Sequence, residues 1–283
     1  MTELIVTTFK KYIGSIADYH LLVALSAAAF AYSSTLQLSI TPDLALITLI
    51  FFATLMTYNV QNLLSRHTHL ERETGAGLHT AFALAGAAGL LICLVNIDWA
   101  LTYWLVPPAL FSLLYTAPVV PCRGQRVGLR EIPWLKLYLI LFVWLWVCVV
   151  LPFAANQQSP DTDLFLLLLQ QGFFLIALLI PFDIRDLSRD LPFQRTIPQI
   201  IGTRWSVRVA VAAVLLYGAT AVIRYLNSAI DEEVFAALLL TGIAAGWLVA
   251  LANESRSGHY YTVWVDSLLW LQLVLILLLT GLF

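Results

Sequence analysis

Long apolar stretches separated by short polar stretches fill this sequence. Each is close to the roughly 20 residues that a helix needs to cross the hydrocarbon layer of a membrane, so the pattern predicts transmembrane helices. The fourth stretch is short and contains Pro107 and Pro108, which predicts a kink that packing must repair. The nine stretches are Ser15 to Leu36, Leu44 to Leu64, Leu78 to Val95, Trp99 to Tyr115, Trp134 to Phe153, Leu164 to Phe182, Trp205 to Tyr225, Val234 to Ala252 and Tyr261 to Leu282.

The basic residues orient these helices. With the N-terminus inside and the chain alternating, all of the 15 Lys and Arg residues except Arg224 fall in inner loops or at inner helix ends. A wrong helix count would scramble this asymmetry, so the positive-inside rule favours nine helices and a cytoplasmic N-terminus. We therefore predict an all-α integral membrane protein with one membrane domain, 1–283, in a bacterial cytoplasmic membrane. Within it, 1–14 is predicted to be interfacial, and 65–77 and 183–204 to be cytoplasmic loops that carry the chemistry.

The composition agrees with a membrane protein. Hydrophobic residues make up 60% of the chain and charged residues 11%, whereas soluble domains carry about 25% charged residues. The formal net charge of -2 argues against nucleic acid as a partner. The three cysteines show no metal or redox spacing. Membrane lipid is the partner that this composition favours.

An acidic cluster follows the sixth stretch. The i, i+3, i+7 spacing predicts that Asp183, Asp186 and Asp190 share one helical face, where three carboxylates repel one another. A hard cation such as Mg²⁺ would relieve that repulsion, since it takes oxygen ligands and often also holds substrate phosphates. Arg185 and Arg189 alternate with the acids and suit outer phosphate oxygens, but they can equally pair with the acids in a solvated helix cap. The sparsely charged stretch 196–202 that follows predicts an ordered cover over a site.

The second stretch ends at the same face with the same spacing. Asn59, Asn62 and Arg66 lie at i, i+3 and i+7, with Tyr58 and Gln61 beside them. Amides within a span usually face the bundle interior or a wet cavity. They also serve simply to hold helices together through hydrogen bonds, and that alternative stays open.

A third basic region precedes the fifth stretch. The arginines between residues 123 and 130 fit a role in topology alone. Lys136 differs because it lies two residues into the predicted helix, where it can point inward at an anion. Asp266, about one turn inside the ninth helix, is a further acid that can face the cavity.

These residues resemble the UbiA superfamily of intramembrane prenyltransferases, whose members have nine helices, an inside N-terminus and Asp-rich motifs after helices two and six. The second motif, D-x-x-D-x-x-x-D, is matched by Asp183, Asp186 and Asp190. The resemblance implies a central cavity in which Mg²⁺ holds an isoprenoid diphosphate. It also implies transfer of the prenyl group to a small lipophilic acceptor, aromatic or a quinone precursor. Weaker similarity extends to Thr196-Ile197-Pro198 with Gly202, and to a tyrosine, a proline and a lysine at Tyr115, Pro118 and Lys136.

The family's first motif, N-D-x-x-D-x-x-x-D, is where this sequence departs. Tyr58, Asn59, Asn62 and Arg66 fill its positions, so every carboxylate is missing. In one outcome Arg66 replaces a metal and binds the diphosphate, a task that suits a planar, bidentate guanidinium. In the other, Arg66 pairs with Asp186 or Asp190, and the protein is a catalytically silent relative acting in lipid binding, scaffolding or transport.

The first outcome is favoured because the second motif is complete. It makes Asp183, Asp186 and Asp190 the Mg²⁺ ligands and catalytic acids. The expected substrate contacts are Asn59, Asn62, Arg66, Lys136, Arg185 and Arg189.

Overall fold

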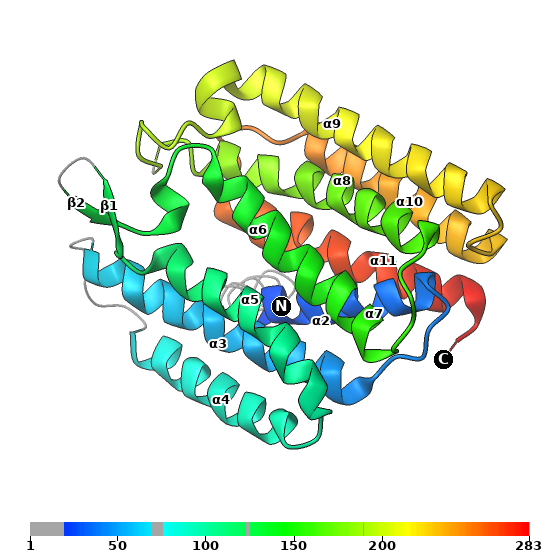
Figure 1. The fold of residues 1–283 in the computed structure, drawn as a ribbon. Helices are drawn as coiled ribbons and strands as arrows, with labels where there is room; N and C mark the ends of the chain where they lie inside the picture. The colour runs from blue at the N-terminus through cyan, green and yellow to red at the C-terminus, as the bar shows by residue number, and fades with distance from the viewer. Residues whose placement is uncertain (1–19, 69–75, 123–124, 189, 283) are drawn as a thin grey trace, which may run out of the picture.

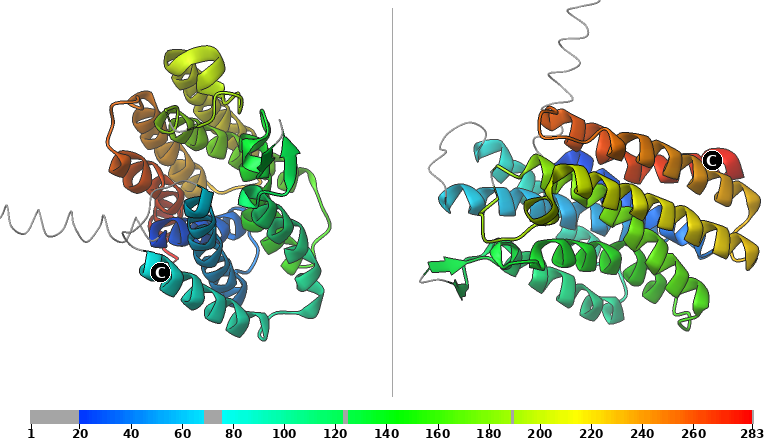
Figure 2. Two further views of the ribbon diagram at one scale, coloured as in Figure 1. Left: turned by 90° about the vertical axis from the view of Figure 1, so that its left-hand side faces the viewer. Right: turned by 90° about the horizontal axis from the view of Figure 1, so that it is seen from above.

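The computed structural model describes residues 20–68, 76–122, 125–188 and 190–282. Within them the chain forms a bundle in which successive long helices run in opposite directions along one axis (Figures 1 and 2). The helices are α2 (Leu21–Gln37), α3 (Leu44–Thr68), α4 (Ala76–Leu94), α5 (Trp99–Thr116), α6 (Leu135–Leu145), α7 (Leu151–Ala155), α8 (Thr162–Arg185), α9 (Ile197–Leu226), α10 (Glu232–Ala250) and α11 (Ser267–Thr280). A π-helix, η2 (Trp146–Val150), joins α6 to α7 in one rod, and a second, η3 (Tyr260–Val265), precedes α11.

Among the described residues, each of the nine predicted stretches lies largely in one of these rods. Helix α5 continues through Pro107 and Pro108. The stretch predicted as a cover is instead a capped helical turn: the main-chain N–H of Thr196 donates to Gln199 Oε1 at 3.1 Å, and the helical path breaks at Gly202. Gly202 has φ 75° and ψ 161°, a backbone conformation that side chains with a Cβ rarely adopt.

A small hairpin at one end of the bundle is absent from the sequence predictions. Strands β1 (Val120–Cys122) and β2 (Gln125–Val127) pair antiparallel, and a short 3₁₀ turn, η1 (Leu129–Glu131), follows. The chain then packs closely onto α5. A Cβ at Gly128 would lie 2.6 Å from the carbonyl oxygen of Tyr115, so glycine permits this close approach. We call this end of the bundle, where α3 and α8 also end, the hairpin end (Figure 1).

The helices form a closed ring. Contacts run from α2 through α3, α5, α6, α8, α9, α10 and α11 back to α2, while α4 packs on the outside of α3 (Figure 2). Such a ring leaves space between its members that side chains either fill or leave open.

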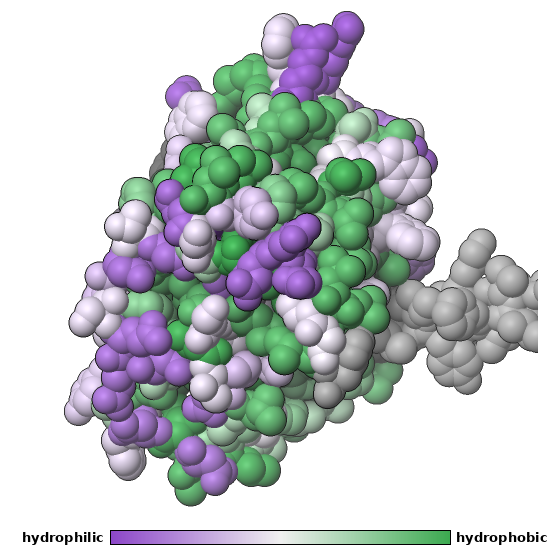
Figure 3. All heavy atoms as spheres, turned by 90° about the vertical axis from the view of Figure 1, so that its right-hand side faces the viewer, coloured by the Kyte–Doolittle hydropathy of each residue, from purple (hydrophilic) through white to green (hydrophobic). Residues whose placement is uncertain are grey.

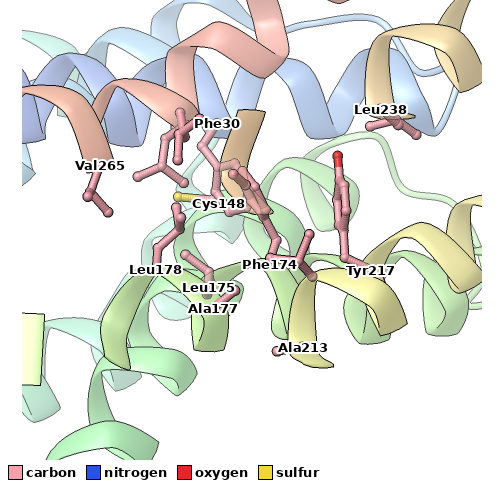
Figure 4. Close-up of a cluster of buried hydrophobic side chains, with 14 of the residues drawn as sticks. Phe30, Cys148, Phe174, Leu175, Ala177, Leu178, Ala213, Tyr217, Leu238 and Val265 are labelled. Atoms are coloured by element: carbon pink, nitrogen blue, oxygen red, sulfur yellow. The ribbon is translucent and has the colours of Figure 1, made fainter. Parts of the chain in front are cut away.

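One half of the interior is filled by a cluster of buried apolar side chains (Figure 4). Phe174 lies at its centre, with ring centroids 6.2 Å from Phe30 and 4.8 Å from Tyr217, and none of the three is exposed. Small buried residues such as Ala27 and Ala31 let α2 approach its neighbours closely, as expected where packing rather than water exclusion holds helices together.

The outer surface fits a lipid environment. In the described part of the chain, seven rods are long and apolar enough to cross a membrane, and large apolar side chains such as Ile243 and Trp247 are exposed on them. Apolar residues also cover much of the end opposite the hairpin, with charged groups scattered among them (Figure 3). Helix α2 is apolar but shorter, and α5 is not among the seven. Nine membrane spans and a cytoplasmic N-terminus therefore stay predictions, and the interfacial segment 1–14 lies outside the described residues.

Candidate functional site

The hairpin end brings the start of α6 against the end of α8. Trp134, just before α6, has a left-handed backbone conformation with φ 69°, and its N–H donates to the carbonyl of Gln194 at 2.9 Å. This main-chain contact ties the first turn of α6 to the loop that follows α8. Lys136, the second residue of α6, is thereby held beside the acidic cluster.

The Lys136 ammonium lies between two carboxylates. It is 2.8 Å from Asp183 Oδ1 and 2.7 Å from Asp190 Oδ2, and the side chains of both acids are at most 10% exposed. The prediction of one helical face for the three acids is wrong. Helix α8 ends at Arg185, and Asp190 lies beyond it in a turn where its N–H donates to the carbonyl of Asp186 at 2.8 Å. The shared lysine, rather than helical periodicity, brings Asp183 and Asp190 together.

The third acid is held by its sequence neighbour. Arg185 donates from Nε to Asp186 Oδ1 and from a terminal nitrogen to Oδ2, both at 2.8 Å, so the pair is bidentate. The guanidinium carbon of Arg185 also lies 4.9 Å from the ring centre of Phe182 and 6.0 Å from that of Tyr261. These aromatic contacts fix the plane of the guanidinium at the mouth of the bundle.

The asparagines of α3 point away from this cluster. Asn59 is fully buried, donates to the carbonyl of Leu55 at 2.9 Å, and its side-chain oxygen lies 2.7 Å from Nδ1 of His79 on α4. The helix-packing alternative describes this position. The side-chain oxygen of Asn62 is buried without a hydrogen-bond partner among the described residues. The side chain of Arg66 and the whole of Arg189 lie outside the described part of the chain, so their roles stay predictions.

A cavity of about 280 Å³ opens beside the ion pairs. Lys136, Asp183, Arg185 and Asp186 line it, whereas Asn59 and Asn62 do not. The sequence predictions assigned no role to seven further polar residues on its wall, although Tyr58, Gln61 and Tyr115 belong to the sequence patterns described above. These seven are His20, Thr57, Tyr58, Gln61, Ser112, Tyr115 and Thr262.

The cavity face of α3 is set by its contacts. Gln61 donates to the carbonyl of Ser112 on α5 at 3.0 Å, and Tyr58 accepts a hydrogen bond from Trp144 Nε1 on α6 at 3.3 Å. These bonds direct the positions one residue before each asparagine into the bundle. The polar signal was present in the sequence, but the rotation of α3 about its axis was not.

A second cavity of about 530 Å³ adjoins the first and lies between α2, α3, α4, α5 and the α6–α7 rod. Its wall is almost entirely apolar. Trp99 and Val106 line it and are also 82% and 59% exposed, so the cavity reaches the lipid-facing surface. Both cavities share Thr57, Tyr58, Ser112, Val143 and Trp144.

The sequence matches no protein-family model and no curated protein. Two solved structures share the architecture over nearly the whole chain. A UbiA homolog from Archaeoglobus fulgidus, bound to GPP and Mg²⁺, is similar at TM-score 0.64 and 9% identity, over 94% of this chain and 99% of that one. A digeranylgeranylglyceryl phosphate synthase is similar at TM-score 0.57 and 15% identity, over 95% and 97%.

The chain has the UbiA fold. The resemblance of the second motif and the ring of helices therefore agree on the architecture. At these identities the likeness shows the fold, and the chemistry has to be argued from the site itself.

The UbiA-like acids fit Mg²⁺ by donor type but not by their present arrangement. Carboxylate oxygens are the ligands that this ion takes. The described residues nevertheless contain no cluster of three acidic, histidine or cysteine side chains arranged around a metal position. Each acid of the second motif faces a basic side chain of the protein instead. Because α3 brings no carboxylate to this cavity, the described residues fit one Mg²⁺ better than two.

Proposed function

We propose that this protein is an intramembrane prenyltransferase, which transfers a prenyl group from an isoprenoid diphosphate to a small lipophilic acceptor, aromatic or a quinone precursor. The observation that carries the proposal is that two unlike cavities lie side by side and share five wall residues. One has basic and acidic side chains at its mouth, and the other is apolar and reaches lipid. An isoprenoid diphosphate has the same division into an anionic head and an apolar tail. That a structure with this fold holds GPP and Mg²⁺ supports the assignment.

Lys136 and Arg185 are the proposed contacts of the diphosphate among the described residues. Both now neutralise carboxylates, and both line the cavity. An arriving diphosphate carries enough charge to compete for them, and a guanidinium binds phosphate oxygens in the same bidentate way that it binds Asp186. The head group would thus draw both cations away from the acids. Arg66 and Arg189 are the proposed further contacts, from the side chains that the structure leaves undescribed.

The acids released in this exchange are the proposed holders of Mg²⁺: Asp183, Asp186 and Asp190. When bound, Mg²⁺ supplies positive charge to the diphosphate as the allylic carbon–oxygen bond breaks. Lys136 and Arg185 add fixed positive charge on the same leaving group. Since neither the acids nor the cations are free before the exchange, metal and diphosphate should bind together rather than one by one.

The prenyl tail is assigned to the apolar cavity. Tyr58 and Trp144 lie where the two cavities meet, so the bond that breaks would lie close to their ring edges. The apolar walls of the second cavity limit the access of water, which traps the allylic cation as an alcohol when no other acceptor is bound. An exit to lipid past Trp99 lets a long tail extend beyond the protein.

One observation favours the alternative, a non-catalytic relative that binds, scaffolds or transports lipid. The three acids are already paired within the protein, so the structure holds together at this site without any ligand. Such a protein would keep the apolar cavity and would not respond to diphosphate.

The deciding experiment uses purified full-length protein with Mg²⁺, a series of prenyl diphosphates and mixed aromatic acceptors, and measures diphosphate release and prenylated product. Asp186→Ala should abolish both signals. Asp231→Ala, at the opposite end of the bundle, should leave them unchanged. If the wild-type protein releases no diphosphate from any donor while it remains folded, and no donor stabilises it against heat, the lipid-binding alternative holds.

A further inference from the structure

Asp266 is placed by a distortion of the last membrane rod. The six residues before it form the π-helix η3, and the N–H of Asp266 donates to the carbonyl of Tyr261, five residues back, at 3.2 Å. A π-turn inserts an extra residue and turns the following side chain to a different face of the helix, and such turns occur often at functional sites. Ser26 on α2 holds the distortion by donating to the Asp266 carbonyl at 3.1 Å.

The Asp266 side chain lines the 280 Å³ cavity together with the acids and bases of the proposed donor site. It forms no salt bridge within the described residues. The nearby Arg185 guanidinium instead makes its two hydrogen bonds to Asp186. The side chain is partly buried, and a carboxylate without a direct partner is unfavourable in such a place. A carboxylate held this way by a main-chain distortion is better explained by a ligand than by packing.

Tyr58 supplies the second polar group of this part of the cavity. Its hydroxyl oxygen accepts from Trp144 Nε1 at 3.3 Å, which leaves the hydroxyl proton to be donated. Asp266 and Tyr58 line the same cavity. Between them they offer one acceptor and one donor, the complement of a ligand hydroxyl. Apolar side chains such as Val23 and Leu269 form the adjacent wall.

The charges of the cavity divide it between two ligands. Lys136 and Arg185 favour an anion beside the acids of the second motif, whereas Asp266 disfavours an anion in direct contact with its own carboxylate. On the basis of the proposed prenyl transfer, we infer that Asp266 is the base for a neutral, hydroxyl-bearing acceptor, which Tyr58 orients. An acceptor that carries its own carboxylate or phosphate at this position would be repelled.

The step balances as a proton transfer coupled to substitution. The allylic carbon–oxygen bond breaks and its electron pair leaves with the diphosphate. The acceptor oxygen forms the new bond to the allylic carbon, and its proton passes to an Asp266 oxygen. Release of that proton to solvent restores the carboxylate. Removing the base should therefore impair transfer while leaving the bond-breaking site intact.

The first test compares wild type with Asp266→Asn, which is nearly isosteric, and measures prenylated product and diphosphate release in the same reactions. Loss of a general base lowers the rate by about 100-fold or more, so product formation should fall by that factor. The rate of diphosphate release should stay within roughly threefold of the wild-type rate, because the base acts on the acceptor and water remains as an alternative acceptor. Tyr58→Phe should raise the KM for the acceptor more than it lowers kcat, because it removes the hydrogen bond that orients the acceptor and leaves Asp266 in place. Equal melting temperatures would show that the variants are folded.

The second test needs no turnover. Binding of a short alkyl hydroquinone, its dimethyl ether and a matched phenol bearing a carboxylate is measured by calorimetry. Wild type should prefer the hydroquinone by about tenfold, as expected for one hydrogen bond to a charged group. Asp266→Asn should lose this preference and should bind the carboxylated phenol better than wild type does.

The outcomes separate the two proposals. Product formation by Asp266→Asn within about threefold of wild type, far less than loss of a base produces, would overturn the role of Asp266 and leave the prenyltransferase standing. An unchanged order of the three probes in the variant would overturn it too. If wild type shows neither transfer nor diphosphate release, the proposed function fails and the base role with it. The probe order then decides only whether Asp266 holds a neutral hydroxyl.

Discussion

Lys136 and Asp183 lie 2.8 Å apart, although they come from different rods of the bundle, and the same ammonium reaches Asp190 at 2.7 Å. A lysine thus holds together the two carboxylates that the motif would offer to a metal. Its removal should leave two nearly buried negative charges facing each other. Because the lysine and a metal would compete for the same carboxylates, a change at Lys136 should alter how much Mg²⁺ stabilises the folded protein.

Lys136→Met should destabilise the protein by about 3 kcal/mol when Mg²⁺ is absent, because it breaks a partly buried ion pair and leaves the acids unpaired. Mg²⁺ alone should restore much of that loss, since it takes the place of the ammonium. Wild type should respond little to Mg²⁺ until a diphosphate is also present. Thermal melting with and without each ligand measures all three effects.

Lys136→Arg is the matched control, because it keeps the positive charge and should melt close to wild type. Equal stabilisation of wild type and Lys136→Met by Mg²⁺ alone would show that the lysine does not compete with the metal.

Bulk placed in the apolar cavity should shorten the prenyl chain that the protein accepts. Ala53 on α3 lines this cavity, and Ala53→Phe would occupy part of its 530 Å³. We expect kcat/KM for long-chain donors to fall by about tenfold relative to a short donor such as GPP, a difference of 1.4 kcal/mol. Competition between donors of two lengths in one reaction measures this ratio directly. Ala85→Phe, on the exposed face of α4, should leave the ratio unchanged. If Ala53→Phe leaves the ratio unchanged, the prenyl tail does not occupy this cavity.

The helices were predictable because hydropathy over about 20 residues depends on the membrane, not on neighbouring helices. The inward direction of Lys136 was also predictable, since a cation inside an apolar helix start needs an anionic partner. The rotation of α3 was not. Motif spacing favoured Asn59 and Asn62, but contacts with α5 and α6 present Tyr58 and Gln61 to the cavity.

The local distortions escaped prediction for a different reason. The π-turn before Asp266 depends on main-chain hydrogen bonding and on Ser26 of a distant helix, neither of which follows from the composition of residues 260–265. The end of α8 at Arg185 also depends on a tertiary contact, because Lys136 holds the turn after it through the ion pair with Asp190. Sequence spacing located these acids, and only tertiary contacts show which of them meet.

Close packing of α4 on α3 requires glycine at position 86. A Cβ there would lie 2.7 Å from the main-chain nitrogen of Met56, and backbone cannot move aside as a flexible side chain can. Gly86→Ala should therefore destabilise the protein by about 1–3 kcal/mol, the usual range for an overpacked contact.

Gly77→Ala, in the same helix, is the matched control because nothing lies within 4 Å of its added Cβ. It should be neutral or stabilise by up to about 1 kcal/mol through helix propensity. Melting curves of the two alanine variants in the same detergent compare them directly. Equal melting temperatures would mean that α4 can move to accommodate the added Cβ without loss of stability.

Arg224, the one basic residue that the charge pattern placed outside, is fully buried. It donates to Asp163 at 2.7 and 3.0 Å, to the side chain and carbonyl of Gln37 at 3.1 and 2.8 Å, and to Gln170 at 2.9 Å. These contacts join α9 to the start of α8 and the end of α2. The residue therefore acts as an internal clamp rather than as a topological signal.

Arg224→Met should lower the free energy of unfolding by about 3 kcal/mol, since five hydrogen bonds are lost at about 0.6 kcal/mol each in a membrane protein. The affinity of the folded protein for an isoprenoid diphosphate should not change, because the clamp lies at the end of the bundle away from Lys136. Arg208→Met is the control: that guanidinium is exposed and lies 4.4 Å from the ring centre of Trp205. Its loss should change stability by less than about 1 kcal/mol. Denaturant unfolding together with a binding titration separates the two quantities. A weakened diphosphate affinity in Arg224→Met would show instead that the two ends of the bundle are coupled.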